Sequence, residues 1–149
     1  RQVSKVFFSP EEVEALPDET LDLVVANSLI QYLSRDELVA LLAIWHGKLR
    51  PGGKLVVADI IPPDVSPLTD ASQLLAFAWR GGFLTAALAG LVRTAFSDYR
   101  KLRAQYGLST YRIDEITGLI AAAGFADVSP AKNFGHNPHR LTLVGRKAG

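Results

Sequence analysis

Two nearly continuous apolar runs constrain the fold of this 149-residue chain more than any other feature of its sequence. They occupy residues 21–26 (LDLVVA) and 54–61 (KLVVADII). Apolar runs of this length without alternation are typical of strands buried on both faces, as in a parallel sheet covered by helices. We therefore expect an α/β fold in which both runs are strands of one sheet.

One helix is predicted between the two runs. Ser34 is followed three residues later by Glu37, which is the signature of a capping box at a helix N-terminus. Apolar residues recur at helical spacing as far as Lys48, and the Arg-Pro-Gly-Gly turn at 50–53 then ends the helix. A strand, a helix and a strand with such short links predict a right-handed parallel crossover.

The rest of the chain continues the alternation of strands and helices. A polar connection is expected at 11–20, and a glycine pair at 81–82 is expected to act as a hinge between two helices. The further expected segments are a strand at 5–9, helices at 68–80, 83–106 and 113–123, and strands at 127–131 and 141–146.

Composition excludes several classes of partner. The net charge is +1, from 16 basic and 15 acidic residues, which gives no case for nucleic acid. The longest uncharged apolar stretch, 81–92, is shorter than the roughly 20 residues of a membrane span. There is no cysteine, and His136 and His139 lack further clustered ligands, so no metal site is expected. No signal peptide is recognisable, and we expect a cytoplasmic protein.

Four segments carry a recognisable pattern in a fixed order. They are LPDETLDLVVANSLIQYL (16–33), LRPGGKLVVADI (49–60), AAAGFADV (121–128) and RLTLVGRK (140–147). Together they resemble the C-terminal part of the class I S-adenosylmethionine (SAM)-dependent methyltransferases, from about the third strand onward. The resemblance implies a Rossmann-like, mostly parallel sheet with an antiparallel final strand, and makes residues 1–149 the C-terminal part of one domain. Residues 62–106 would form a helical lid insert.

The family's cofactor-binding segments do not match any part of the chain. In the family, a glycine-rich loop after the first strand and an acidic residue after the second hold SAM. By the resemblance this chain begins at the third strand, so the N-terminal strands of the family fold are missing. The chain also begins at Arg1 and has no methionine, which is typical of a fragment or a processed product. We expect the chain alone to bind SAM poorly, and its sheet to be completed by about 60–100 further residues or by a partner chain.

Candidate site residues follow from the rule that open α/β sheets bind ligands outside the carboxyl ends of their strands. Asn27, Ser28 and Gln31 follow the first apolar run, and Tyr32 comes next. The resemblance implies that Asn27 and Ser28 line SAM and that Gln31 faces the reacting methyl group or the acceptor. Ordinary loop capping is the alternative for all three. Asp59, at the end of the second run, either faces the acceptor or has a capping or surface role.

The insert at 62–106 leaves the sheet from the same edge and is placed to cover an acceptor pocket. Its apolar side chains, among them Phe83, predict a small hydrophobic acceptor. Tyr111 borders the insert and either contacts the acceptor or only packs. His136 lies in the last hairpin loop and is either a contact to the acceptor or an ordinary exposed loop histidine. The alternative is that the insert packs on the domain or on the second subunit of a homodimer.

The resemblance thus implies an enzyme that transfers a methyl group from SAM to a small-molecule acceptor. We assign no catalytic residue, because in-line methyl displacement depends largely on proximity and orientation. A non-catalytic fragment that acts as a dimerisation or scaffold subunit is the alternative. A short-chain dehydrogenase is discounted, because the nearest match to its Tyr-x-x-x-Lys pair is Tyr99 with Arg103.

Overall fold

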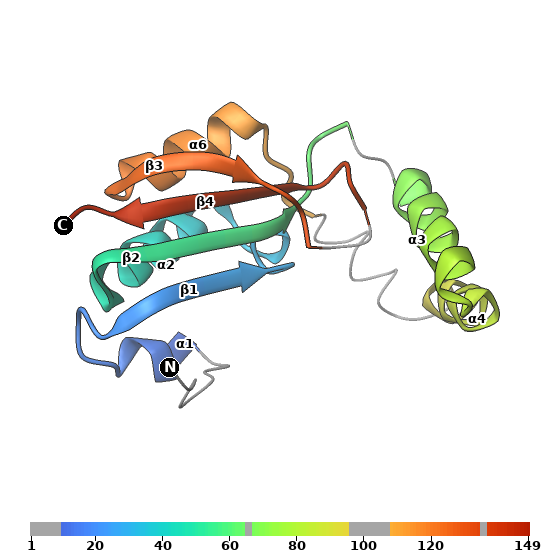
Figure 1. The fold of residues 1–149 in the computed structure, drawn as a ribbon, viewed down its shortest axis with the longest axis horizontal. Coiled ribbons are helices and arrows are strands. Elements are labelled where there is room, and N and C mark those ends of the chain that lie inside the picture. Colours follow the sequence, from blue (N-terminus) through green and yellow to red (C-terminus); the bar gives the residue numbers. More distant parts are fainter. Residues whose placement is uncertain (1–9, 65–66, 96–107, 135–136) are drawn as a thin grey trace.

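The computed structural model describes residues 10–64, 67–95, 108–134 and 137–149 (Figure 1). The expected strand at 5–9 and the later part of the expected helix at 83–106 lie outside these ranges. The elements are α1 (Pro10–Glu14), β1 (Leu21–Asn27), the 3-10 turn η1 (Ile30–Tyr32), α2 (Arg35–Lys48), β2 (Leu49–Ile60), α3 (Pro67–Gly81), α4 (Leu84–Ala95), α6 (Ile113–Ala122), β3 (Phe125–Ala131) and β4 (Leu141–Lys147).

The described strands form one four-stranded sheet in the order β1-β2-β4-β3. Strands β1 and β2 are parallel neighbours, and β4 is antiparallel to both β2 and β3 (Figure 1). Three strands therefore point one way and the last strand points the other. The α/β fold and the antiparallel final strand expected from the sequence are confirmed.

Helix α2 begins where the sequence predicts. The Ser34 hydroxyl accepts a hydrogen bond from the Glu37 amide at 3.3 Å, and the Ser34 amide donates to the Glu37 carboxylate at 2.7 Å. This reciprocal pair satisfies two amide groups that have no partner within the helix. The helix then directs three buried side chains toward the sheet: Leu38, Leu42 and Trp45.

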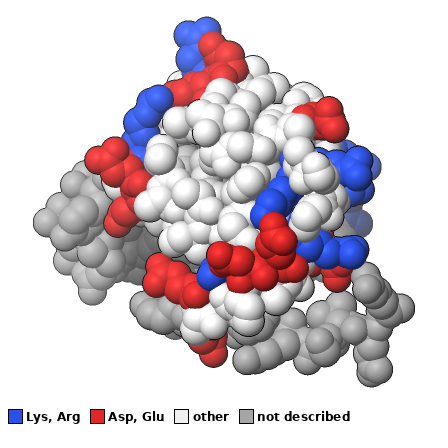
Figure 2. Space-filling model, turned by 90° about the vertical axis from the view of Figure 1, so that its left-hand side faces the viewer, with Lys and Arg blue, Asp and Glu red and all other residues white. Residues whose placement is uncertain are grey.

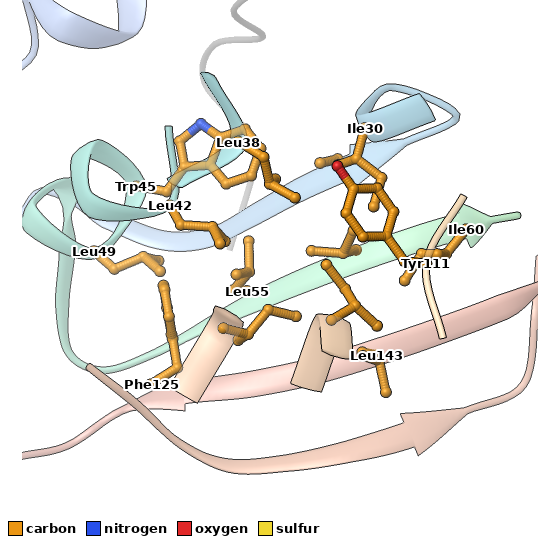
Figure 3. Close-up of a cluster of buried hydrophobic side chains, with 14 residues drawn as sticks. Ile30, Leu38, Leu42, Trp45, Leu49, Leu55, Ile60, Tyr111, Phe125 and Leu143 are labelled. Atoms are coloured by element: carbon orange, nitrogen blue, oxygen red, sulfur yellow. The ribbon is translucent and has the colours of Figure 1, made fainter. Parts of the chain in front are cut away.

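The core lies between these side chains, helix α6 and one face of the sheet. Leu55 and Val57 of β2 are fully buried there, and Ile116 and Ile120 of α6 pack into the same cluster. Figure 3 shows the α2 side chains directed toward Leu55. Gly124, with φ of 99°, allows the chain to turn from α6 into β3 where it passes close to a histidine ring.

The expectation that residues 21–26 are buried on both faces is wrong. Side chains alternate along a strand, so Val24 and Ala26 face the core while Leu23 and Val25 face the other side of the sheet. Leu23 and Val25 are 51% and 54% exposed. The physical reason is that α2 and α6 both pack on the same face, which leaves the opposite face of β1 open among the described residues.

The end of the sheet where β1 and β2 begin is held by two largely buried lysines. Lys48 Nζ donates to Asp18 and to the Leu16 carbonyl, both at 2.8 Å, and the hydrogen bond lowers the pKa of the Asp18 carboxyl. Lys147 Nζ donates to the Leu49 carbonyl at 2.8 Å. Figure 2 shows this end of the molecule, with charges of both signs mixed around an uncharged centre. The polar segment at 11–20, expected as a connection, also contains the short helix α1.

We expect Ser34→Ala to lower the free energy of unfolding by about 1 kcal/mol, because the variant loses the side-chain acceptor of the N-cap. Urea denaturation of the two proteins measures the difference. Glu37→Gln is the matched control, since glutamine serves the same position of a capping box and should cost less. Equal losses for both variants would contradict this account of the helix start.

The capping box also predicts a pH dependence. The hydrogen bond from the Ser34 amide lowers the pKa of the Glu37 carboxyl below its ordinary value of 4.5. A lowered pKa in the folded state stabilises the protein fully above pH 4.5, and this contribution is lost as the pH falls through the folded value. The advantage of the native chain over Glu37→Gln should therefore shrink in urea denaturation at about pH 3. An advantage that does not change with pH would refute the shift.

Candidate functional site

The carboxyl ends of β1 and β2 carry two residues in an unusual backbone conformation. Ser28 has φ of 53° and Asp59 has φ of 62°, although neither is glycine. Residues other than glycine seldom adopt the left-handed region, and such residues cluster at functional sites. The pairing of β2 with β4 is irregular between Val57 and Ile60, so Asp59 lies at a bulge. Bulges next to sites commonly redirect a side chain.

The Asp59 carboxylate joins three elements at this edge of the sheet. Its Oδ2 atom accepts a hydrogen bond from the Ser28 hydroxyl at 2.6 Å and another from Arg140 Nη1 at 2.8 Å. The side chains of Asp59 and Arg140 are only 14% and 12% exposed. The pair therefore fixes the end of β1 and the start of β4 to the end of β2. We call Asn27, Ser28, Gln31 and Asp59 the carboxyl edge.

The connection between β3 and β4 is fastened to the same edge by asparagines. Asn133 Oδ1 accepts from the Asp59 amide at 3.2 Å and from the Thr142 hydroxyl at 2.9 Å. Asn133 Nδ2 donates to the Asn137 carbonyl at 3.0 Å, and the Asn137 side chain is fully buried. Sequence reasoning missed this network and Arg140. The one available signal was the asparagine and proline content of the connection at 133–139.

Gln31 is the buried polar residue with an unsatisfied atom. Its side chain is 4% exposed, and its Oε1 has no hydrogen-bond partner among the described residues. The Gln31 backbone is satisfied, since its carbonyl accepts from the Ser109 amide at 2.9 Å. A buried acceptor without a donor costs about 1–3 kcal/mol. Gln31 therefore offers an acceptor to a donor group at the edge where such sheets bind ligands.

The other predicted site residues lie in different environments. Asn27 and Tyr32 are exposed beside Gln31. Tyr111 is 4% exposed and belongs to the core cluster, where burial raises the pKa of its hydroxyl. Tyr111 thus packs in the core, and its contact with an acceptor stays a prediction. His136 lies outside the described residues.

The described part of the insert forms α3 and α4, which meet at Gly82 with φ of 74°. The Phe83 ring, partly exposed after this turn, contacts the Phe77 ring edge-on at a centroid distance of 5.6 Å. Phe77 also borders a cavity of about 430 Å³ between α3 and the β3–β4 connection. Trp79 and Leu88 are exposed on these helices.

No group of three or more His, Cys, Asp or Glu side chains in the described part of the chain could hold a metal ion. None of the helices in that part combines the length and apolarity that crossing a membrane requires.

No family model matches the chain, and no curated protein matches it in sequence. Solved structures match it in fold at low identity. A protein from Bordetella parapertussis described as "a possible exported protein" has a TM-score of 0.57 and 19% identity, over 92% of this chain and 42% of that one. Human N-acetylserotonin methyltransferase in complex with SAM has a TM-score of 0.55 and 15% identity, over 92% of this chain and 32% of that one.

A third similar structure holds two bound small molecules. It is the 1,6-didemethyltoxoflavin-N1-methyltransferase of Burkholderia thailandensis with bound 1,6-didemethyltoxoflavin and S-adenosylhomocysteine (SAH). It has a TM-score of 0.52 and 17% identity, over 92% of this chain and 48% of that one. The chain spans less than half the length of each of the three proteins. Its fold is that of the SAM-dependent methyltransferases, as the sequence resemblance implies.

Because Asp59 and Arg140 form an ion pair of low exposure, we expect a small substitution at Asp59 to reduce the stability of the fold strongly. Asp59→Asn keeps a residue type that tolerates positive φ but leaves the Arg140 charge without its carboxylate, so we expect a loss of about 3 kcal/mol in the free energy of unfolding. The control is Asp114→Asn, which removes an exposed partner of Arg112 and should cost less than about 1 kcal/mol. Thermal and urea unfolding compare the variants, and losses of similar size would contradict a structural role for the pair.

Proposed function

We propose that this chain forms part of an enzyme that transfers a methyl group from SAM to a small acceptor. The fold supports the proposal, because similar solved methyltransferases hold SAM or SAH. The observation that carries it is the unpaired, buried Gln31 Oε1 at the edge of the sheet where ligands of such folds bind. The proposal concerns part of a site, since the chain spans less than half of the similar proteins.

The carboxyl edge supplies polar groups suited to this cofactor. Asn27 presents an exposed amide, and Gln31 Oε1 can accept a hydrogen bond from an amino group. The Ser28 hydroxyl donates to Asp59, so its oxygen is left to act as an acceptor. When bound, SAM would supply the methyl group from its sulfonium. Asp59 then acts as a positioning residue, because it holds Ser28 at the end of β1.

Helices α3 and α4 lie in a segment that leaves the sheet from this edge, and we propose that they cover the acceptor. Tyr32 and Phe83 are the exposed aromatic residues suited to contact an apolar acceptor there. Covering the acceptor would hold it against the methyl donor and exclude water, and proximity of this kind supplies much of the rate enhancement in a displacement reaction.

A non-catalytic role as a dimerisation or scaffold subunit is the second candidate. Half-exposed Leu23 and Val25 on the open face of β1 favour it, because exposed apolar patches commonly mark interfaces. Sedimentation velocity separates a monomer from a dimer. A dimer that loses its association in the Val25→Lys variant, without binding SAH, would support this role over the enzymatic one.

Gln31→Leu tests the cofactor proposal through two quantities that should respond differently: the affinity for SAH and the stability to unfolding. Loss of one hydrogen bond should weaken SAH binding about tenfold in calorimetric titration, while removal of an unsatisfied buried acceptor should leave unfolding stability unchanged or raised. Arg112→Gln, a change at an exposed arginine, should alter neither quantity. Because the chain alone is expected to bind the cofactor weakly, the titration is carried to high SAH concentrations; no binding even there would refute a cofactor site at this edge. Equal SAH affinity in Gln31→Leu would remove Gln31 from it.

A further inference from the structure

The cavity between α3 and the β3–β4 connection has the size of a small-molecule site. Its volume is about 430 Å³, within the range of roughly 300–1,000 Å³ that is usual for ligand pockets. Phe77 and Arg80 of α3 form one wall. Pro130, Lys132, Pro138 and Leu141 contribute to the other. The lining therefore combines an aromatic ring and aliphatic surface with cationic side chains.

The charge of this cavity is not balanced by its lining. Arg80, Lys132 and Arg140 border it, and no carboxylate does. Arg140 is committed to Asp59 at 2.8 Å. Neither Arg80 nor Lys132 forms an ion pair with a carboxylate in the described part of the chain, and both are exposed at the cavity. Two positive charges thus remain for a ligand to neutralise.

The neutral polar side chains of the lining, Asn133 and Thr142, are held in the fold by hydrogen bonds. Asn133 Oδ1 accepts two hydrogen bonds and Asn133 Nδ2 donates one, while the Thr142 hydroxyl donates to Asn133. The cationic groups that remain are hydrogen-bond donors only, because arginine and protonated lysine carry no acceptor. A ligand that satisfies them must present acceptors, and an oxyanion does so with charge assistance. The Phe77 ring borders the cavity and packs edge-on against Phe83, and it adds an aromatic contact for a ligand ring.

We propose that this cavity binds a small aromatic molecule carrying a carboxylate or phosphate group, and that such a molecule is the methyl acceptor. This inference rests on the proposed function and specifies its small acceptor as an aromatic molecule that also carries an anionic group. The Asp59 carboxylate connects the two sites, because Arg140 borders the cavity and Ser28 belongs to the carboxyl edge. A donor bound at the carboxyl edge and an acceptor in the cavity would be held by the same ion pair.

The test titrates benzoate, phenyl phosphate and neutral benzyl alcohol into the isotopically labelled 149-residue chain, followed by NMR shifts of the amides at 131–133. SAH is left out. We expect the better of the two anions to bind about tenfold more tightly than benzyl alcohol, and its identity distinguishes a carboxylate from a phosphate. Raising the salt concentration from about 0.05 M to about 0.5 M should weaken anion binding and leave benzyl alcohol unaffected.

Paired variants locate the charge that is responsible. Arg80→Gln with Lys132→Gln should reduce anion binding about tenfold, to the level of benzyl alcohol. Lys54→Gln with Arg146→Gln removes two exposed cations from neighbouring strands at the opposite end of the sheet and should change nothing. Circular dichroism checks that both pairs fold. Equal affinity for all three compounds, equal loss in both double variants, or no shifts at 131–133 would each overturn the proposal.

The two proposals fail separately in these experiments. Anion binding at the cavity, with no SAH binding even at high SAH concentration, would keep the anion site and refute the cofactor site at the carboxyl edge. SAH binding without a preference for anions at the cavity would support the cofactor site and refute the proposal of an anionic acceptor.

Discussion

The ion pair between Asp59 and Arg140 is the interaction on which the functional end of this structure depends. Asp59 takes part in it from a bulge in β2, where its backbone has a positive φ. The same carboxylate also accepts a hydrogen bond from the Ser28 hydroxyl. Three segments that are distant in sequence are fixed in this way: the end of β1, the end of β2 and the start of β4. A charge pair of such low exposure is costly to break, because removal of one partner leaves the other desolvated and uncompensated.

The two ends of the sheet differ in how completely their polar groups are satisfied. Where β1 and β2 begin, Lys48 and Lys147 donate to backbone carbonyls and to carboxylates, and these bonds hold the chain in place. Where the same strands end, Gln31 Oε1 has no partner among the described residues and Arg80 and Lys132 border a cavity. We interpret the first end as structural and the second as the binding end, which agrees with the general preference of open α/β sheets.

The sequence predicted those features that depend on local signals. The capping box at Ser34 defined the start of α2, because it acts over a few residues. The helix ends at Lys48 as expected, but the predicted turn at 50–53 belongs to the irregular first part of β2, which begins at Leu49. The apolar runs predicted β1 and β2 and their parallel pairing, and the family resemblance implied the antiparallel final strand. Burial of Leu23 and Val25 was predicted wrongly, because an apolar run indicates a strand but does not say which faces receive helices.

The site itself was predictable only in part. The rule about carboxyl ends located Asn27, Ser28, Gln31 and Asp59 at one edge, and the structure brings Ser28 and Asp59 into contact. The partners of Asp59 lie 31 and 81 residues away, so pattern reading could not find the role of Arg140. The unpaired state of Gln31 Oε1 is likewise a property of the packed fold, since it depends on which donors come close.

The most direct test of this account is an NMR titration of the labelled chain with SAH, in which the shifted amides are mapped onto the sheet. The account predicts shifts centred on Asn27, Ser28 and Gln31, with little change near Lys48 and Lys147. Shifts centred on Lys48 and Lys147, or no shifts even at SAH concentrations high enough to reveal weak binding, would contradict the claim that the carboxyl edge is part of a cofactor site.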